Sequence, residues 1–231
     1  MSVSVIIPSY HQIDMVLMAL SSMSKHDFNA LIRRFVVVEN SSEDITQKVL
    51  DAIGVSYNVT VLNNDTLYRC GWAQAEAYEL GLEHVDTEHV FLCHCDINVC
   101  SRIFWDVITE KIADGYDLIG AMRDPATIHA VYSCGFAVRT DIARTVDLRP
   151  NNVPTDTHEC ADEVTTYCER EGKRIYVFPE AKLDPRDVQR VMYKGELVFA
   201  HLQRGQLKAS GVYRKPGRFL YKDWKEFCCE N

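Results

Sequence analysis

The triplet His94-Cys95-Asp96 carries the residue types best suited to chemistry, because it places an imidazole and a carboxylate two positions apart. The apolar pattern around it predicts a buried strand over residues 89–95. Side chains alternate along a strand, so His94 and Asp96 are expected on one face, with Cys93 and Cys95 on the other. Carboxylates suit hard divalent ions. The spacing therefore offers two polar groups to one site.

Polar segments also follow the three strands predicted earlier in the chain. In a doubly wound parallel sheet, ligands bind at the carboxyl ends of the strands. The polar segments at the four strand ends are Ser9-Tyr10-His11, Glu39-Asn40, Asn63-Asn64-Asp65 and His94 to Asn98. The chain has neither G-x-G-x-x-G after its first strand nor G-x-x-x-x-G-K-[ST] anywhere, which disfavours a dinucleotide dehydrogenase or a P-loop enzyme. The remaining possibility is a nucleotide site built without a glycine-rich loop, in which a metal ion offsets the charge of the diphosphate.

Cysteines 93, 95 and 100 stand close to His94 in the sequence and raise zinc as an alternative, since sulfur and imidazole are its preferred ligands. No second pair with C-x-x-C spacing occurs nearby. A buried strand also accommodates cysteine as a small apolar residue. Zinc is therefore disfavoured.

The elements that must position these residues follow from hydrophobic periodicity. Short β-branched runs alternate with amphipathic stretches, which predicts an α/β fold with a mostly parallel sheet between helices. Strands are predicted over residues 3–8, 35–38, 57–62, 89–95, 117–121, 131–139 and 174–178. Helices are predicted around Leu17 and Leu20 and over 72–85, 101–113 and 162–171. After Pro179 the periodicity is weak, and we expect only short strands and a tail.

Composition limits the class of protein. The 231 residues fit one α/β domain, and 47% hydrophobic with 25% charged residues is typical of a globular chain. The net charge of −8 disfavours nucleic acid and anionic lipid, except at a basic C-terminal run from Arg204 to Lys225. Nine scattered cysteines and no signal peptide ahead of Val3 predict a reducing, cytoplasmic location. No apolar stretch is long enough to span a membrane.

Four segments together resemble the GT-A glycosyltransferases, specifically the large family 2. They are Val3-Ser-Val-Ile-Ile-Pro-Ser-Tyr10, Val36-Val-Val-Glu-Asn40, Gly71-Trp-Ala and Val90-Phe-Leu-Cys-His-Cys-Asp96. The resemblance covers residues 3–100 well and 130–201 more loosely. It implies a single GT-A domain over 1–231, with a Rossmann-like central sheet and a smaller subsheet on the acceptor side. Within it, 1–100 would bind the nucleotide sugar, 101–203 the acceptor, and 204–231 would form a basic tail.

The resemblance also implies a donor site. Pro8 and Tyr10 would lie beside the nucleobase, and Glu39 would form a hydrogen bond to it. A carboxylate accepts hydrogen bonds and so suits the N3–H group of uracil, which favours a UDP-sugar as the sugar donor. Arg69 and Gly71 would lie near the diphosphate.

The family's metal motif is Asp-x-Asp, and here His94 replaces the first aspartate while Asp96 takes the position that coordinates the ion. His94 is also implied in donor binding. His201 resembles the C-terminal histidine that completes the metal site in many members. The ion implied is Mn²⁺ or Mg²⁺, and imidazole favours Mn²⁺.

The acidic segment Glu159-Cys-Ala-Asp162-Glu163 resembles the family motif that supplies the general base. We expect Asp162 to be that base, with Glu163 as the alternate. The strand containing Cys134 and Gly135 resembles the segment lining the acceptor pocket, where glycine would let a sugar approach the backbone.

These features predict a metal-dependent glycosyltransferase that moves a sugar from a nucleotide sugar to an acceptor hydroxyl by a single inverting displacement. One alternative is a sugar-phosphate nucleotidyltransferase, although the loop Ser9-Tyr10-His11-Gln12 lacks the glycine, arginine and lysine usual there. Another is a non-catalytic module that binds nucleotide sugars or glycans. The sequence does not identify the acceptor, which could be a glycan, a lipid-linked sugar, a protein or a hydroxymethylated DNA base.

Overall fold

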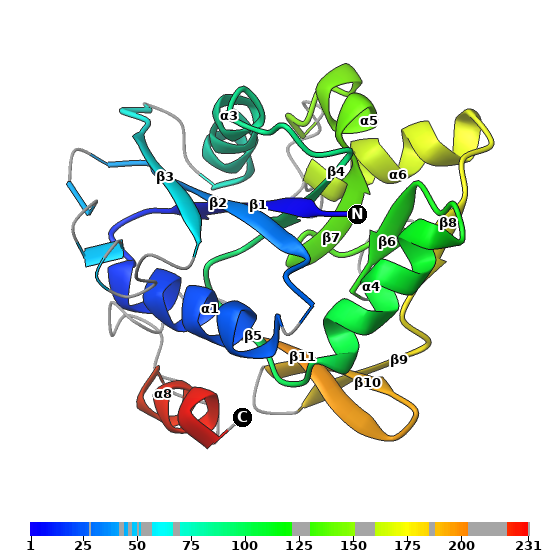
Figure 1. The fold of residues 1–231 in the computed structure, drawn as a ribbon. Helices are drawn as coiled ribbons and strands as arrows, with labels where there is room; N and C mark the ends of the chain where they lie inside the picture. The colour runs from blue at the N-terminus through cyan, green and yellow to red at the C-terminus, as the bar shows by residue number, and fades with distance from the viewer. Residues whose placement is uncertain are drawn as a thin grey trace.

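The structure is a computed structural model of the chain. It describes residues 1–27, 29–41, 44–45, 48–49, 51, 57–66, 70–121, 130–150, 160–184, 188–202 and 221–230. Within these ranges the chain folds into one sheet of seven strands and one of four, with helices packed on both faces of the larger sheet (Figure 1). The predicted α/β class, the mostly parallel central sheet and the smaller second sheet are therefore confirmed.

The larger sheet has the strand order β3-β2-β1-β4-β7-β6-β8. Its strands are β1 (Val3–Ser9), β2 (Ile32–Glu39), β3 (Asn58–Asn63), β4 (His89–Cys93), β6 (Leu118–Gly120), β7 (Gly135–Arg139) and β8 (Ile175–Val177). All neighbouring pairs are parallel except those of β7, which runs antiparallel to β4 and β6. The apolar runs Val5–Pro8 of β1 and Phe35–Val38 of β2 suit strands that are covered on both faces.

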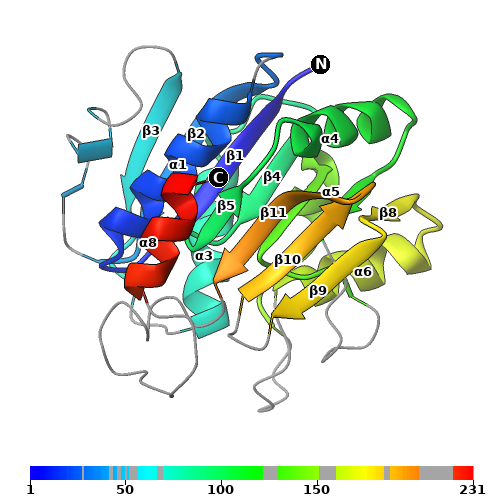
Figure 2. The same cartoon turned by 90° about the horizontal axis from the view of Figure 1, so that it is seen from below.

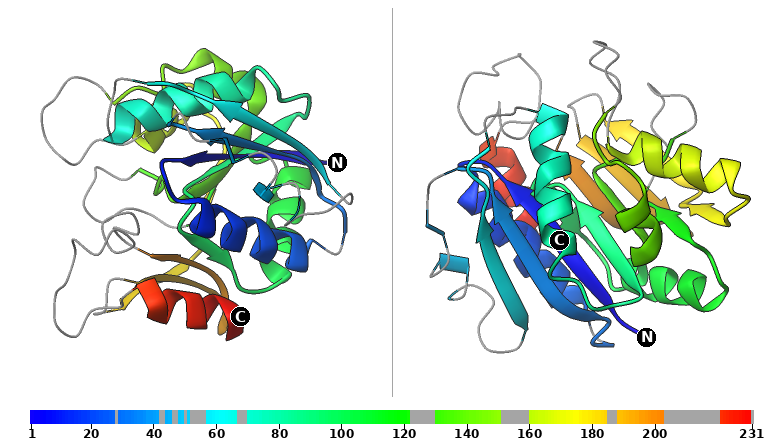
Figure 3. Two further views of the ribbon diagram at one scale, coloured as in Figure 1. Left: turned by 90° about the vertical axis from the view of Figure 1, so that its left-hand side faces the viewer. Right: turned by 90° about the horizontal axis from the view of Figure 1, so that it is seen from above.

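Helices cover both faces of this sheet (Figures 1 and 3). On one face lie α3 (Cys70–Leu82), α5 (Thr140–Thr145) and α6 (Cys160–Arg170), and on the other lie α1 (Ile13–His26) and α4 (Ile103–Ala113). Close packing of α3 requires Gly81, because a Cβ there would lie 2.6 Å from Cγ2 of Ile6 on β1. The ends of β1, β2 and β3 that follow these packed runs all lie at one edge of the sheet.

The smaller sheet has the order β5-β11-β10-β9 and is antiparallel throughout. Its strands are β5 (Ile97–Val99), β9 (Glu180–Asp184), β10 (Val188–Tyr193) and β11 (Glu196–Leu202). It lies beside α1 and α4, as the view in Figure 2 shows. Phe199 of β11 stacks on Phe104 of α4 with ring centroids 5.0 Å apart, so the two sheets share one apolar core.

A last helix, α8 (Tyr221–Glu230), packs against α1 and the smaller sheet. Trp224 is fully buried there, and Lys225 forms a 2.9 Å ion pair with Asp14 of α1. Residues 221–230, expected to be part of a tail, therefore form a helix, whose signal in the sequence is the three-residue spacing of Tyr221, Trp224 and Phe227. Residues 204–220 of the predicted tail lie outside the described ranges. No helix in the described part of the chain is both long and apolar enough to cross a membrane.

Candidate metal and nucleotide site

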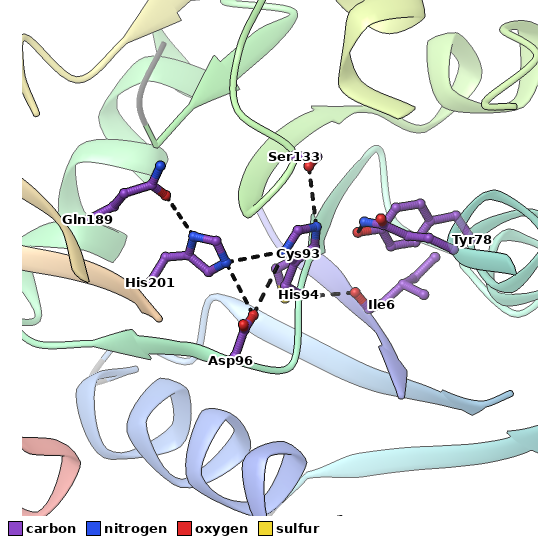
Figure 4. Close-up of polar contacts among 9 residues, drawn as sticks. Ile6, Tyr78, Cys93, His94, Asp96, Ser133, Gln189 and His201 are labelled. Carbon is purple, nitrogen blue, oxygen red and sulfur yellow. Dashed lines mark hydrogen bonds and ion pairs between the residues drawn. The ribbon is translucent and has the colours of Figure 1, made fainter. Parts of the chain in front are cut away.

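His94, Asp96 and His201 bring three possible ligand atoms together (Figure 4). Nε2 of His201 lies 3.2 Å from Oδ1 of Asp96 and 3.3 Å from Nδ1 of His94, and Nδ1 of His94 lies 3.8 Å from the same carboxylate oxygen. All three atoms lie within 4.8 Å of one another. Among the residues that the structure describes, this is the one such group of histidine, cysteine or acidic side chains. Its donor atoms suit a divalent cation.

The smaller sheet carries His201 to Asp96. Asp96 immediately precedes β5, which pairs with β11 so that Ile97 stands opposite His201. The N–H of Leu202 donates to the carbonyl oxygen of Asp96 at 2.9 Å, which fixes the two chains at that point. A residue far along the sequence is thus held beside Asp96 by a backbone ladder rather than by side chains alone.

His94 and Asp96 lie in the turn between β4 and β5, because β4 ends at Cys93. The prediction of one strand to residue 95 was therefore wrong, and so was the argument that strand alternation places the two side chains together. They meet because the turn folds them inward. The N–H of His94 donates to the carbonyl oxygen of Cys134 at 3.1 Å, which holds this turn against the segment before β7.

Two buried polar side chains outside the cluster contact the imidazoles. Oε1 of Gln189 lies 2.6 Å from Nδ1 of His201, and Oγ of Ser133 lies 3.2 Å from Nε2 of His94. Gln189 stands directly opposite His201 on β10. Sequence reasoning missed both residues, since Gln189 falls where periodicity is weak and Ser133 was included in a predicted strand.

The neighbouring thiols do not join the cluster. Cys93 is fully buried in the larger sheet, where its Sγ donates to the carbonyl oxygen of Ile6 at 3.8 Å. Burial raises the pKa of the Cys93 and Cys95 thiols well above the ordinary value, which keeps them protonated. The three ligand atoms that converge in the cluster are imidazole nitrogens and a carboxylate oxygen, and neither cysteine contributes one.

Glu39 ends β2 as a fully buried carboxylate. Its Oε1 accepts the backbone N–H of His11 at 3.0 Å, whereas Oε2 has no hydrogen-bond partner among the described residues. Ser9 stands opposite Glu39 on β1, and its buried hydroxyl also has no hydrogen-bond partner among the described residues. Buried polar atoms without partners are costly, so both atoms are suited to receive a ligand.

The other residues predicted for the donor site lie around the same edge. Pro8 is half-buried, while Tyr10 is 49% exposed and packs its ring edge against His11. Gly71 lies in the first turn of α3. Arg69 lies outside the described residues. Asn40 connects the end of β2 to α3 by donating to the carbonyl oxygen of Ala73 at 3.1 Å.

Helix α6 begins close to this edge. Sγ of Cys160 donates to the carbonyl oxygen of Gly71 at 3.5 Å, and Oγ1 of Thr165 accepts the N–H of Val131 at 3.1 Å. Asp162 and Glu163 are half-buried in the first turn of the helix between these two contacts. Glu159 lies outside the described ranges. The base role of Asp162 stays a prediction, and its helix starts beside Gly71.

Cys134 and Gly135, predicted for the acceptor side, are both buried. A Cβ on Gly135 would lie 2.9 Å from Cζ of Phe199 and 2.9 Å from Cζ of Phe91. Two phenyl rings thus fill the space beside the glycine. Core packing accounts for the glycine here, and the acceptor role stays a prediction.

Gly135→Ala is expected to lower the free energy of unfolding by about 1–3 kcal/mol, the usual cost of overpacking a core. The rings of Phe91 and Phe199 both pack against Phe104 and have little room to move. Denaturant unfolding measures the change. Gly195→Ala is the comparison: no atom lies within 4 Å of a Cβ there, so any loss of stability in that variant measures backbone strain at its φ of 85° without overpacking. A Gly135→Ala protein as stable as the parent would contradict this packing.

Comparison with known proteins finds a match in structure alone. No protein-family model matches the chain. No curated protein sequence matches it either. The mannosyltransferase PcManGT from Pyrobaculum calidifontis, in complex with GDP-Man and Mn²⁺, superposes with a TM-score of 0.59 at 18% identity, over 77% of this chain and 55% of that one.

Two further structures match in the same way. S. aureus TarS 1–349, in complex with UDP-GlcNAc, has a TM-score of 0.58 at 17% identity, over 77% of this chain and 56% of that one. Glucosyl-3-phosphoglycerate synthase from Mycobacterium tuberculosis, with Mn²⁺ and UDP-glucose, has a TM-score of 0.52 at 15% identity, over 76% and 68%.

The chain has the GT-A glycosyltransferase fold. It spans about half the length of the mannosyltransferase and of TarS 1–349. At these identities the likeness establishes the fold, and the chemistry has to be argued from the site.

Proposed function

We propose that this protein is a metal-dependent glycosyltransferase that moves a sugar from a nucleotide sugar to an acceptor hydroxyl. The observation that carries the proposal is the cluster of His94, Asp96 and His201 just beyond the carboxyl end of β4. Ligands bind at this edge in open α/β sheets, and three convergent ligand atoms at the edge suit a nucleotide diphosphate held through a metal ion. The structural neighbours include proteins in complex with nucleotide sugars and Mn²⁺, which supports the same reading.

Glu39 supports a uracil nucleotide as donor. Its buried Oε2 is an acceptor without a partner among the described residues, and the N3–H of uracil is a donor of matching kind. Tyr10, which is largely exposed at the end of β1, would cover the base. A UDP-sugar is therefore the first donor to test. Arg69 and Gly71 remain proposed contacts of the diphosphate.

The reaction we propose is a single displacement at the anomeric carbon. A bond forms between the acceptor oxygen and that carbon as its bond to the diphosphate oxygen breaks, and Asp162 takes the proton of the acceptor hydroxyl. When bound at the cluster, a divalent ion supplies positive charge that offsets the charge developing on the leaving diphosphate. Glu163 is the alternate base. The anomeric configuration is expected to invert.

A screen of UDP-, GDP-, ADP- and dTDP-sugars with Mn²⁺ tests the proposal, with release of the nucleoside diphosphate as the readout. Water serves as acceptor, so the true acceptor need not be known. We expect Mn²⁺-dependent release from one class of donor, with UDP-sugars first. Binding of a nucleotide sugar with no release under any condition would favour a non-catalytic module instead. The acceptor itself remains to be sought among glycans, lipid-linked sugars, proteins and modified DNA.

A further inference from the structure

We propose that Gln189 is a positioning residue of the proposed metal site, and that it holds His201 so that the cluster of His94, Asp96 and His201 can take a transition-metal ion before any nucleotide binds. This proposal deepens the proposed function. Only the role given to the ion, which is to hold the diphosphate, rests on that function. The binding itself is a property of the protein alone. It is therefore measured without a nucleotide sugar.

Gln189 sets the tautomer of His201. The amide oxygen Oε1 can only accept a hydrogen bond, and it lies 2.6 Å from Nδ1 of the imidazole. In a neutral ring, Nδ1 then carries the proton and Nε2 carries the lone pair. Nε2 is the atom that lies 3.2 Å from the carboxylate of Asp96 and 3.3 Å from Nδ1 of His94. The lone pair needed by a metal ion thus points at the other ligands.

The arrangement of the cluster is held rigidly by its surroundings. Gln189 and His201 are 2% and 3% exposed, and the pairing of β10 with β11 places them face to face. The β5–β11 pairing fixes Asp96 beside His201, and the contact of Ser133 fixes the ring of His94 from its far side. A site whose ligands are already in position loses little side-chain entropy when an ion binds. The side chain of His94 is still 23% exposed, which leaves the cluster open to solvent on one side.

The ligand set predicts which ions the site takes. Two imidazole nitrogens and one carboxylate oxygen suit first-row transition ions, whereas Mg²⁺ prefers carboxylates, phosphates and water around it. Three protein ligands can hold such an ion without help from a diphosphate. We therefore expect Co²⁺ and Mn²⁺ to bind the free protein, with Co²⁺ the tighter of the two in accordance with the general affinity order. Mg²⁺ is expected to bind more weakly than Mn²⁺, because imidazole suits it less well.

The contrary interpretation is a structural cluster that ties the β4–β5 turn to the smaller sheet by hydrogen bonds alone. Titration of Mn²⁺ into the chelator-treated full chain, followed by the loss of the free-ion EPR signal, separates the two. Binding without nucleotide, lost in His201→Ala, supports a metal site. No binding of Mn²⁺ or Co²⁺ in the absence of nucleotide, or equal affinity for Mg²⁺ and Mn²⁺ in competition, would overturn it.

The role of Gln189 is tested by Gln189→Leu and Gln189→Glu. We expect the leucine variant to lose about 10- to 100-fold in Mn²⁺ affinity, as is usual when the partner of a ligating histidine is removed. The glutamate variant keeps an acceptor opposite Nδ1 and should keep most of the affinity. Gln74→Leu, which removes a glutamine that contacts Tyr78 on α3, is the matched control and should bind Mn²⁺ like the parent. Unchanged affinity in Gln189→Leu would refute the positioning role.

A measurement on the parent protein covers the case in which Gln189→Leu does not fold. Long-range ¹H–¹⁵N NMR spectra of the metal-free chain report which ring nitrogen of each histidine carries the proton. We expect Nδ1 of His201 to carry a proton opposite Oε1 of Gln189, whether or not Nε2 also carries one opposite Asp96. An unprotonated Nδ1 would overturn the assignment to Gln189, whatever the variants do.

Discussion

Asp96→Ala is expected to reduce Mn²⁺-dependent release of UDP from a UDP-sugar by roughly a hundredfold to a thousandfold, the usual cost of removing a group that stabilises developing charge. The substitution removes the carboxylate oxygen that lies 3.2 Å from Nε2 of His201 and so removes the anionic member of the cluster. The measurement is the initial rate of UDP release at saturating donor and Mn²⁺. A separate titration of Mn²⁺ should show that binding of the ion is weakened in parallel.

Asp86→Ala is the matched control for this result. Asp86 is an exposed carboxylate that pairs with Arg33 at 3.1 Å, and exposed pairs of this kind contribute little to stability. Its replacement should leave the rate unchanged and the fold intact. If Asp96→Ala cleaves the donor at the rate of the parent, the cluster is not part of the catalytic site.

Asp162→Asn is expected to lower the rate of sugar transfer by about a hundredfold to ten-thousandfold, which is the usual contribution of a general base. The amide has the size of the carboxylate but cannot accept the proton of an acceptor hydroxyl. Affinities for Mn²⁺ and UDP should stay as in the parent, because Asp162 is outside the metal cluster. The rate is measured with the acceptor found by screening, and the product's anomeric configuration is read by NMR.

Glu163→Gln provides the comparison on the same helical turn. Both acids lie half-buried at the start of α6, so a general loss of negative charge there would affect both variants alike. A loss confined to Glu163→Gln would move the base to Glu163, and parent-like rates in both would refute a base on α6. A product with retained configuration would contradict the single displacement itself.

The sheet and the ends of its first strands could be predicted from sequence because they depend on local signals. β1 and β2 are rich in β-branched residues, and the polar residues at their carboxyl ends, such as Glu39, are found at one edge of the sheet. A parallel sheet brings strand ends together whatever the details of packing. The order of helices and strands as far as β8 follows from the same periodicity, apart from the three-residue β5 and the short α5.

The cluster was harder to predict, since it depends on pairing between distant residues. His201 was identified by resemblance alone, and the contact that places it beside Asp96 is the β5–β11 ladder, in which β5 is a strand of three residues. No pattern in the sequence pairs Gln189 with His201. The turn that joins His94 to Asp96 was mistaken for strand, because Cys95 follows the apolar run that ends at Cys93 with only one polar residue between them.

The packing of the core accounts for Gly135, which was assigned to the acceptor side by resemblance. The Cys134-Gly135 pair was interpreted as an opening for an acceptor sugar, yet two rings from different strands, Phe91 and Phe199, occupy the space beside the glycine. Sequence cannot reveal which atoms fill the space beside a glycine. The same limit applies to α8, whose burial depends on a neighbouring helix and sheet.

The most direct test of the account is the affinity of the protein for UDP, measured by calorimetry with and without Mn²⁺ and compared with its affinity for uridine. If the diphosphate binds through an ion held by His94, Asp96 and His201, Mn²⁺ should strengthen UDP binding by about 5- to 150-fold, the usual range of coupling between linked sites. It should leave uridine binding unchanged, because uridine has no phosphate. Equal affinity for UDP with and without Mn²⁺ would contradict the account.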